Sequence, residues 1–491
     1  MKINHAWLQQ WLPHLKLDHM QVIEWLNSRG LETELVYSSN LDRVCVGKVI
    51  KAESIQGSRK LNICQVDVGD ETLSIVCGCS SVRAGINVAV ARCGAQLPGL
   101  TIVAREVMGV RSEGMLCAAN ELGYAHAGKG IWHLSSSALV GQPLSDYLQT
   151  SSIVYAIDIT PNRGDAMSAR GIARELAHAS TQQLKLPCAR PENKTAWGSL
   201  KNQVELSTDC QAYFRLQMDG VAAVQTPDWM ALRLNEAGIR QHHPVVDILN
   251  YTMLETGQPM HGYDAQTCTG EFSVGWGDEV DLTLLDGRVV QVDSRTVVVR
   301  CQDKIICLAG YMGDQSSQIR DDTTSIIIEA AHFSAHHLAY TCRRYQQHSQ
   351  AGSRFERGVD PTIAHDAIYR AAQLIEEITG AKIVASGGYE HKITPRSIHL
   401  EQAKIVRHLG FSYPGAEVTK SLEKLGFSPV STATGWDVHV PSWRQEISRP
   451  EHILSELLRD LGIPENSRST MNITLPVWSN NEQRAFDYAR S

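Results

Sequence analysis

The sequence predicts a multidomain α+β protein, and three observations support this fold class. At 491 residues the chain is too long for one hydrophobic core, because domains of roughly 100–200 residues are usual. Short strands rich in Val and Ile alternate with turns over residues 45–103, whereas helical and mixed patterns dominate later in the chain. The content of 43% hydrophobic and 20% charged residues is typical of globular proteins.

The sequence predicts a soluble cytoplasmic protein with no membrane contact. It contains no apolar run near the ~20 residues that a membrane helix needs, and its first residues lack the features of a secretory signal. Twelve cysteines are scattered along the chain, and the closest pair, Cys77 and Cys79, lacks the C-x-x-C spacing of zinc and redox sites. Reduced, mostly buried thiols are therefore expected. The net charge of −7 means that any nucleic-acid contact must use local basic patches.

The first domains can be outlined from local patterns. A helical pattern at the N-terminus precedes five short strands with Gly-containing connections. This arrangement is typical of a small barrel of the oligonucleotide-binding kind, although another small all-β module would have the same pattern. The five segments are VCVGKVIKA, LNICQVDVGD, LSIVCGCSS, NVAVARCG and LTIVAREV.

Two polar, Pro- and Gly-containing stretches, 186–202 and 386–397, predict linkers around a larger α+β region. That region closes with a helical pattern at 362–380, whose apolar residues Ile368, Ala371, Ala372 and Ile375 can share one face. The segments after the second linker, VRHLGF, LEKLGF, WDVHVP and EHILSELLRDLG, predict a compact unit of helices and a small β wing. Residues after about 468 have no complete core of their own.

An ordered series of motifs resembles the β subunit of bacterial phenylalanyl-tRNA synthetase. The resemblance covers nearly all of residues 1–465. The motifs are GINVAVARCGAQLPG, VRSEGMLCAANELG, ITPNRGDAMSARGIARELA, VVDILNYTMLETGQPMHGYD, LAGYMGDQSSQI, IIIEAAHFS, SRFERGVDP and PSWRQEISRPEHILSELLRDLGI.

The resemblance implies a specific domain order and predicts a chain that stops before two family modules, a catalytic-like module and an anticodon-binding domain. The implied parts are an N-terminal helical module at 1–38 completed by about 150–200, a tRNA-binding barrel at 39–149, an editing domain at 205–385, a winged-helix-like domain at 395–467, and at 468–491 a stub of the catalytic-like module.

The resemblance also implies a function. The chain would be a synthetase component that binds tRNA(Phe) and hydrolyses mischarged Tyr-tRNA(Phe), while an α subunit uses ATP to attach phenylalanine. The family assembly is an α2β2 tetramer, and ATP is not expected to bind this chain alone. Two alternatives remain open: a freestanding editing hydrolase, and a non-catalytic tRNA-binding or regulatory paralogue.

The implied hydrolytic pocket would allow the enzyme to discriminate tyrosine from phenylalanine. A hydrophobic pocket rejects an isostere with an added hydroxyl by only ~10²-fold, so discrimination against tyrosine needs a second site. By resemblance, Glu329 accepts a hydrogen bond from the tyrosine hydroxyl, while Ala309, Gly310 and Ala351 leave room for the ring. Asn250 and His261 match residues that position the terminal adenosine, the ester carbonyl and a water. We expect His261 to orient this water and not to act as general base, since no nucleophile-base pair is evident.

Other residues near these motifs are expected to have structural roles. Glu255 is interpreted as a solvated or capping carboxylate, and 257–259 as a turn. Arg354, Glu356 and Arg357 are interpreted as a structural ion-pair network, with contacts to tRNA phosphates as the alternative.

The chain also departs from the family pattern. Leu249 stands where a Thr is common, Gly352 where a Ser is common, and IQGSRKL, with Arg59 and Lys60, where a His-Pro-Asn-Ala-Asp segment is common. The resemblance places a Mg²⁺ site in the last domain, and Glu446 and Glu456 match two of its carboxylates. His452 and Ser455 replace two others, so weak or lost binding is expected.

Overall fold

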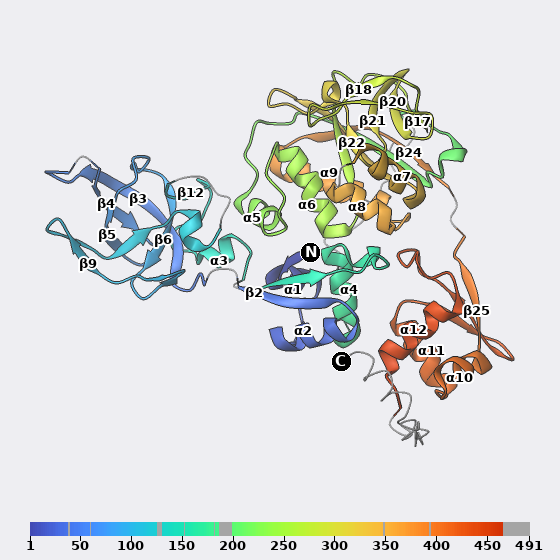
Figure 1. Cartoon of the computed structure of the whole chain (residues 1–491). Coiled ribbons are helices and arrows are strands. Elements are labelled where there is room, and N and C mark those ends of the chain that lie inside the picture. Colours follow the sequence, from blue (N-terminus) through green and yellow to red (C-terminus); the bar gives the residue numbers. More distant parts are fainter. Residues whose placement is uncertain are drawn as a thin grey trace, which may run out of the picture. The chain divides into compact units, whose positions relative to one another are not determined.

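The computed structural model describes residues 1–37, 40–58, 60–124, 130–151, 153–180, 182–185, 199–346, 349–391 and 394–464. The chain forms two units, one of Met1–Arg396 with Val440–Ser448 and one of Ser397–His439 with Arg449–Ser491. The first unit contains an N-terminal module, a barrel and a central α+β domain (Figure 1). Most of the predicted 186–202 linker and the predicted 468–491 stub lie outside the described residues. None of the helices in the described ranges is long and apolar enough to cross a membrane.

The N-terminal module is built from two distant stretches of chain. Its helices are α1 (His5–Trp11), α2 (His19–Ser28) and α4 (Ala169–Ser180), and its antiparallel sheet has the order β1 (Lys2–Asn4), β13 (Ile153–Asp158), β2 (Glu32–Tyr37). The Asn4 side chain caps α1 by accepting from Ala6 N, and its amide donates to Thr150 Oγ1 at 2.7 Å. This residue therefore links the two stretches. The prediction of a helical module missed the three-stranded sheet.

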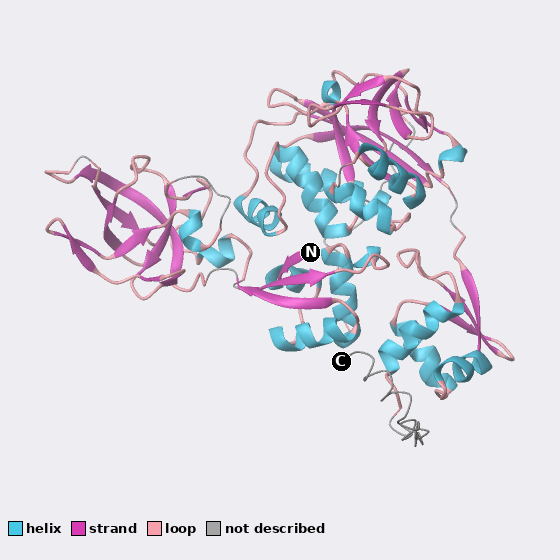
Figure 2. Cartoon of the chain, in the orientation of Figure 1, coloured by secondary structure: helices cyan, strands magenta, loops and turns pink. Residues whose placement is uncertain are grey.

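The barrel forms where the alternating pattern predicts it. Its main strands are β3 (Val44–Ser54), β4 (Asn62–Asp67), β5 (Thr72–Cys77), β6 (Asn87–Arg92) and β11 (Gly114–Leu116), in the order β11-β6-β3-β4-β5, and β12 (His133–Leu134) also pairs with β6. Glu113 N donates to Ser74 O at 2.8 Å, which joins the two ends of this order. Figure 2 shows the barrel as mostly strand, with α3 (Leu144–Tyr147) as a short helix beside it.

The predicted fifth strand, LTIVAREV, is wrong as a single element. Residues 100–107 contribute to two short hairpins, β7 (Gln96–Leu97) with β8 (Leu100–Thr101), and β9 (Arg105–Val107) with β10 (Val110–Ser112). Gly99 at φ 75° turns the first hairpin, and Met108 and Gly109, both at positive φ, turn the second. Residues 114–116 pair with β6 in place of the predicted strand.

The central domain packs two sheets face to face. The first has the order β16 (Met260–Asp264), β23 (Ser325–His332), β15 (Ala212–Asp219), β24 (Lys382–Glu390). The second has the order β14 (Asn202–Val204), β17 (Phe272–Trp276), β20 (Val297–Cys301), β21 (Lys304–Leu308), β22 (Met312–Gly313). The small hairpin of β18 (Asp281–Thr283) and β19 (Val289–Gln291) completes the strands.

Helices cover the other face of the first sheet. Alternate residues of β15 and β23 enter two different cores, one shared with the second sheet and one shared with α6 (Pro244–Thr256) and α9 (Ala364–Thr379). As predicted, the apolar residues of α9 lie on one buried face. The remaining helices of the domain are α5 (Asp228–Glu236), α7 (Ala335–Tyr345) and α8 (Gln350–Arg357).

The expected linker at 386–397 is wrong in its first half, because residues 386–390 form the end of β24. The main chain at Leu200 crosses close to Gly387, and a Cβ at position 387 would approach Leu200 O to 2.1 Å. This part of the chain at Leu200 is called the crossing segment. Gly387 therefore reflects a close approach of backbone and not a flexible connection.

The second unit has the predicted combination of helices and a small sheet. Its strands run in the order β25 (Ser397–Glu401), β27 (Gly435–His439), β26 (Ser428–Ser431), and its helices are α10 (Gln402–Leu409), α11 (Gly415–Lys424) and α12 (Pro450–Leu461). Ile405, Leu422 and Ile453, one from each helix, are fully buried and form part of its core.

Candidate functional site

The candidate site begins with one row of side chains across the first sheet of the central domain. His261 on β16 is paired with Glu329 on β23, and Glu329 is paired with Arg215 on β15. Directly opposed residues of antiparallel strands project from the same face. This face is the one that packs on the second sheet, so the row carries an imidazole, a carboxylate and a guanidinium into the layer between the sheets.

Glu329 is a buried carboxylate held by two tyrosines. Its Oε2 accepts hydrogen bonds from Tyr213 Oη at 2.6 Å and from Tyr263 Oη at 2.9 Å. Burial raises the pKa of Glu329, and the two hydroxyls and the charge of Arg215 oppose this rise. Within the described residues, Oε1 has no hydrogen-bond partner. Glu329 can therefore accept one more donor.

His261 is held as a neutral ring. Burial lowers its pKa to about 4, so the imidazole is uncharged near neutral pH. Its ring contacts the Tyr263 ring edge-on, with centroids 4.6 Å apart. Its Nε2 lies against Gly313, where a Cβ would approach it to 2.4 Å, and this nitrogen is buried without a partner among the described residues. A neutral imidazole of this kind can orient a water molecule.

A small cavity lies beside these groups. Its volume is about 40 Å³, close to the ~30 Å³ share of one water molecule, so an aromatic ring enters only if the walls move. His261, Gly310, Glu329 and Ala351 all line it, which brings together four of the residues singled out from the sequence. The other lining residues are Pro259, Met260, Cys307, Tyr311, Ala331, Phe333 and Phe355.

Two singled-out residues lie outside the lining. Ala309 is 1% exposed and packs in the core between the sheets. Asn250 is half-buried on α6, the helix that covers the other face of the sheet. Its neighbour Leu249, at the position where a Thr is common, is buried in the helix-side core.

Two glycines are explained by the space around the cavity. A Cβ at Gly352 would approach Cys342 Sγ and Ser349 Oγ to 3.1 Å each. At Gly310, where φ is 67°, a Cβ would approach Phe355 and Phe333 within about 3 Å. A side chain at Gly310 is therefore disfavoured by both the φ angle and the neighbouring rings, whereas a Cβ at Gly352 needs Cys342 and Ser349 to shift by a few tenths of an ångström.

The interpretation of Glu255 as a solvated or capping carboxylate is wrong. Glu255 is 2% exposed, accepts a hydrogen bond from Tyr251 Oη, and forms an ion pair with Arg370, whose Nε lies 2.8 Å from Oε2. Its partner comes from α9, far along the chain. The turn at 257–259 forms as expected, with Gly257 at φ 90° ending α6. Gln258 is fully buried there and donates to Pro259 O and Ala331 O.

Among the described residues, the arginines of SRFERG donate to carbonyls and not to carboxylates. Arg354 Nε donates to Met167 O at 3.1 Å, and Arg357 Nη1 donates to Ile159 O at 2.8 Å. These bonds fasten α8, which carries the cavity residues Ala351 and Phe355, to the N-terminal module. The motif is structural, but the expected ion-pair network is replaced by hydrogen bonds between charged groups and backbone.

Four residues around Glu329 were not singled out from the sequence: Tyr213, Arg215, Tyr263 and Cys307. The alternation of β15, in which Tyr213 and Arg215 share a face, was a usable signal. Their connection to Glu329 depends on strand pairing across more than a hundred residues, which local patterns do not reveal.

The residues matched to a Mg²⁺ site do not fit that ion. Glu446 Oε1 accepts from Arg444 Nε at 2.6 Å, and Glu456 Oε1 accepts from Arg459 Nη1 at 2.8 Å. Ser455 Oγ donates to Glu451 O, and His452 can offer only nitrogen. Mg²⁺ needs several oxygen ligands in near-octahedral geometry. Across the described ranges, no group of three or more His, Cys, Asp or Glu side chains could hold a metal ion.

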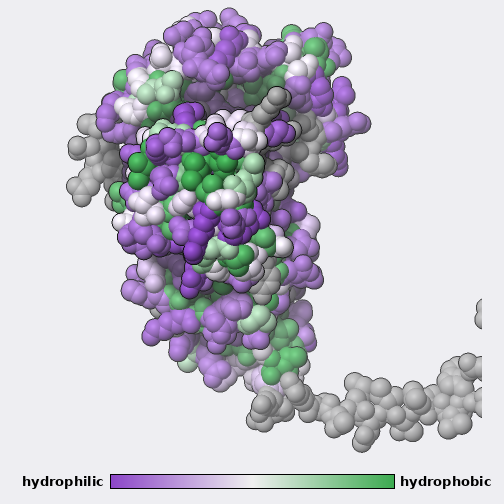
Figure 3. Space-filling view, turned by 90° about the vertical axis from the view of Figure 1, so that its left-hand side faces the viewer, coloured by the Kyte–Doolittle hydropathy of each residue, from purple (hydrophilic) through white to green (hydrophobic). Residues whose placement is uncertain are grey.

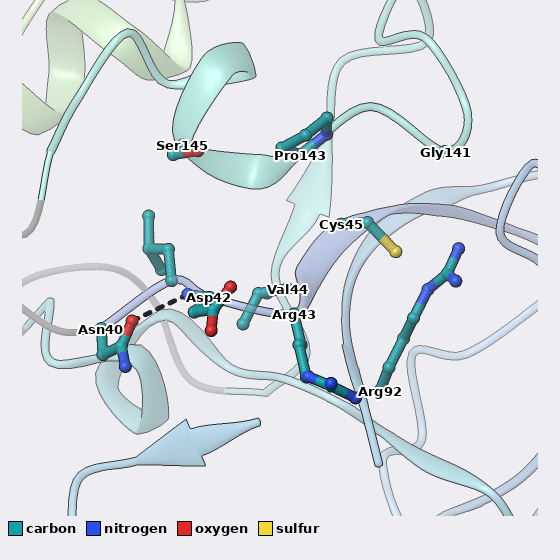
Figure 4. A pocket seen from close by; sticks show the side chains of 10 residues that line it. Asn40, Asp42, Arg43, Val44, Cys45, Arg92, Gly141, Pro143 and Ser145 are labelled. Carbon is teal, nitrogen blue, oxygen red and sulfur yellow. Dashed lines mark hydrogen bonds between the residues drawn. The ribbon is translucent and has the colours of Figure 1, made fainter. Parts of the chain in front are cut away.

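The barrel carries a second candidate site, a hollow of about 640 Å³ (Figure 4). Arg43 and Arg92 lie on one side of it, with Cys45 between Arg92 and Pro143. Arg92 forms an ion pair with Asp70, whereas Arg43 donates only to Cys93 O among the described residues. Arg43 therefore retains donors for an anionic ligand such as a phosphate. Of the predicted basic pair, Lys60 is exposed, and Arg59 lies outside the described residues.

Apolar side chains also reach the barrel surface. In Figure 3 a cluster of hydrophobic residues lies among mostly hydrophilic ones on the near surface. The exposed apolar residues of the barrel are Ile50, Leu100, Val103, Met108 and Leu139. The described cysteines are all free, and all but Cys79 and Cys93 are buried.

Three protein families match successive parts of the chain. A putative tRNA binding domain matches residues 44–143, a B3/4 domain matches 209–380, and a tRNA synthetase B5 domain matches 398–463. They coincide with the barrel, the central domain and the second unit. The fold and the candidate site are thus similar to those of domains found in tRNA-binding and aminoacyl-tRNA synthetase proteins.

Curated relatives give a more specific similarity than the domain families do. The phenylalanine--tRNA ligase beta subunit of Vibrio cholerae is 35% identical over 472 residues, and that of Xylella fastidiosa is 37% identical over 471. Both alignments cover 94% of this chain and 59% of the relative. The chain is a homologue of the phenylalanine--tRNA ligase beta subunit and spans about 59% of the length of the curated relatives it matches.

A solved structure gives weaker similarity. An N-terminal fragment of the phenylalanyl-tRNA synthetase beta-subunit from Pyrococcus horikoshii is 13% identical, with a TM-score of 0.34. The match covers 63% of this chain and 88% of that one.

Proposed function

We propose that the central domain hydrolyses Tyr-tRNA(Phe), with Glu329 as the group that recognises the tyrosine hydroxyl. The observation that carries the proposal is the buried Glu329 carboxylate on the cavity wall, with its Oε1 unpaired within the described residues. A phenol can donate to this oxygen, whereas a phenylalanine side chain would leave it unpaired, which costs free energy.

The remaining roles belong to the same proposal. His261, neutral at pH 7, orients the attacking water, and Gly310 and Ala351 leave room as the walls move apart for the ring. Asn250, half-buried on α6, contacts the tRNA end outside the ring cavity. The barrel binds the tRNA backbone, with Arg43 among its contacts.

We further propose that the chain acts in the cytoplasm with a phenylalanyl-tRNA synthetase α subunit, which uses ATP to attach phenylalanine. The similarity to beta subunits supports this partner. Since the matched carboxylates are paired with arginines, no step of the proposed reaction uses Mg²⁺.

The test is hydrolysis of Tyr-tRNA(Phe) and Phe-tRNA(Phe) by the purified chain, with and without α subunit. We expect tyrosine release to exceed phenylalanine release and to fall about a hundredfold in Glu329→Gln, since a hydrogen bond to a charged group is lost. Glu377→Gln makes the same change at an exposed helical position and should keep the wild-type rate. Equal hydrolysis by Glu329→Gln and wild type would contradict the role of Glu329.

A further inference from the structure

Two tyrosines of the protein itself converge on the recognition carboxylate. Tyr213 on β15 is paired with Ala331, and Tyr263 on β16 is paired with Ile327, so the two tyrosines flank Glu329 from opposite sides of β23. Both hydroxyls donate to the same oxygen, Oε2. This geometry fixes the carboxylate in one orientation, because rotation would break both bonds.

A buried guanidinium reinforces this arrangement. Arg215 is 0% exposed, and its partners are all neutral: its Nε donates to Asn202 Oδ1 at 2.6 Å and its Nη2 to Lys201 O at 2.8 Å. Its guanidinium carbon lies 3.8 Å from the centroid of the Phe272 ring. Within the described residues Arg215 has no ion-pair partner, and the carboxylate paired with it across the strands is Glu329. Its charge favours the ionised form of that carboxylate.

We propose that Tyr213 and Tyr263 are positioning residues that hold Oε2 of Glu329, so that only Oε1 is offered to the side chain of the aminoacyl group. The inference rests on the proposed editing function and extends it to the origin of specificity. Neither tyrosine touches the reacting ester. Both act through Glu329.

The positioning determines how phenylalanine is rejected. A carboxylate that is free to turn could satisfy itself with nearby donors when a phenylalanyl group fills the cavity. A carboxylate held at Oε2 cannot turn toward other donors. When a phenylalanyl group enters the cavity, Oε1 of this carboxylate therefore loses its contact with water and gains no new hydrogen-bond partner. The two tyrosines therefore penalise phenylalanine and leave the bond to a tyrosine hydroxyl intact.

The experiment compares Tyr213→Phe, Tyr263→Phe and the double variant, each of which removes only hydroxyl groups. The measured quantity is the ratio of kcat/KM for Tyr-tRNA(Phe) to kcat/KM for Phe-tRNA(Phe). We expect each single variant to lower this ratio about tenfold, with the change mainly in KM. Tyr345→Phe is the matched control, since Tyr345 lies in the same core but its hydroxyl bonds to Thr296 and Gln291. An unchanged ratio, or an equal loss for both substrates, would overturn the proposal.

A binding measurement separates this inference from the proposed function. Calorimetry with L-tyrosinamide and L-phenylalaninamide needs no hydrolysis. If the wild-type chain hydrolyses neither aminoacyl-tRNA but prefers tyrosinamide, and Tyr263→Phe loses this preference, the editing function fails and the positioning role stands. If the wild type hydrolyses Tyr-tRNA(Phe) and the variants still bind L-tyrosinamide more tightly than L-phenylalaninamide, the positioning role fails and the editing function stands. No preference in the wild type also overturns it.

Discussion

His261 and Glu329 lie directly opposite each other on β16 and β23, yet no hydrogen bond joins them within the described part of the chain. The carboxylate bonds to two tyrosines, and the imidazole packs between Tyr263 and Gly313. A buried acid and a buried base on one row would usually form a pair. Because these two do not, each is available to act on a different part of a substrate.

The size of the side chain at position 351 should control access to the cavity. Ala351→Leu adds three carbon atoms to the wall of a cavity of about 40 Å³, and we expect hydrolysis of Tyr-tRNA(Phe) to fall about a hundredfold. The chain should remain folded, as judged by its thermal unfolding. Ala351→Ser is nearly isosteric and should stay within a few-fold of the wild type. A fully active Ala351→Leu protein would place the substrate side chain elsewhere.

Buried His332 should make stability depend on pH. Its side chain is 5% exposed, and burial lowers its pKa from 6.5 to about 4. Above pH 6.5 the histidine is neutral in both the folded and unfolded states. As pH falls below 6.5 the unfolded state gains a proton first, so stability is lost, by about 2 kcal/mol at pH 5.

His332→Gln should remove this part of the pH dependence. The measurement is urea unfolding at pH 7 and pH 5 for both proteins, with exposed His14→Gln as the control. A His332→Gln protein that loses as much stability as the wild type on acidification would show that His332 is protonated in the folded state.

Gly387 should tolerate no side chain. In Gly387→Ala the Cβ would lie 2.1 Å from Leu200 O, and because the obstacle is main chain, the strand or the crossing segment must shift. We expect a loss of about 3 kcal/mol in the free energy of unfolding. Gly78→Ala, where the nearest atom is 3.6 Å away, should change it by less than about 0.5 kcal/mol. Equal changes in the free energy of unfolding for the two substitutions would mean that the crossing segment can move away from position 387 at little cost.

The Arg163–Asp165 pair should contribute more to stability than a surface ion pair. Arg163 donates to both oxygens of Asp165, at 2.9 and 3.0 Å, and the two side chains are 3% and 1% exposed. Asp165→Asn leaves the buried guanidinium without its full counter-charge and should cost about 3 kcal/mol. Glu53→Gln, in an exposed pair with Lys51, should cost at most about 1 kcal/mol. Chemical denaturation of the two variants and the wild type measures these losses in the free energy of unfolding, and equal losses would contradict the prediction.

Local patterns predicted much of the fold. The alternation at 45–92 identifies four barrel strands, and the apolar spacing at 368–375 identifies the buried face of α9. The same reasoning failed at 100–107, because this stretch is divided between two short hairpins and not one paired strand, with Leu100 and Val103 exposed and Ile102 buried. Propensity alone does not distinguish these cases.

The resemblance singled out some of the residues that line the candidate cavity, and their roles there stay predictions. Glu329, His261, Gly310 and Ala351 share one cavity, but the resemblance did not identify Tyr213, Tyr263 or Arg215. Glu255 was misinterpreted for the same physical reason, since its partner Arg370 lies 115 residues away. Burial and pairing of charged side chains depend on tertiary contacts that short motifs do not encode.

The two arginines of α8 have a consequence for how the protein is made. Arg354 and Arg357 bond to carbonyls at positions 167 and 159, which leave the ribosome nearly two hundred residues before α8 does. The anchor for the pocket wall can thus be folded before the wall itself is synthesised. A central domain excised at residue 199 would lack this anchor, so a minimal editing fragment should include the second stretch of the N-terminal module.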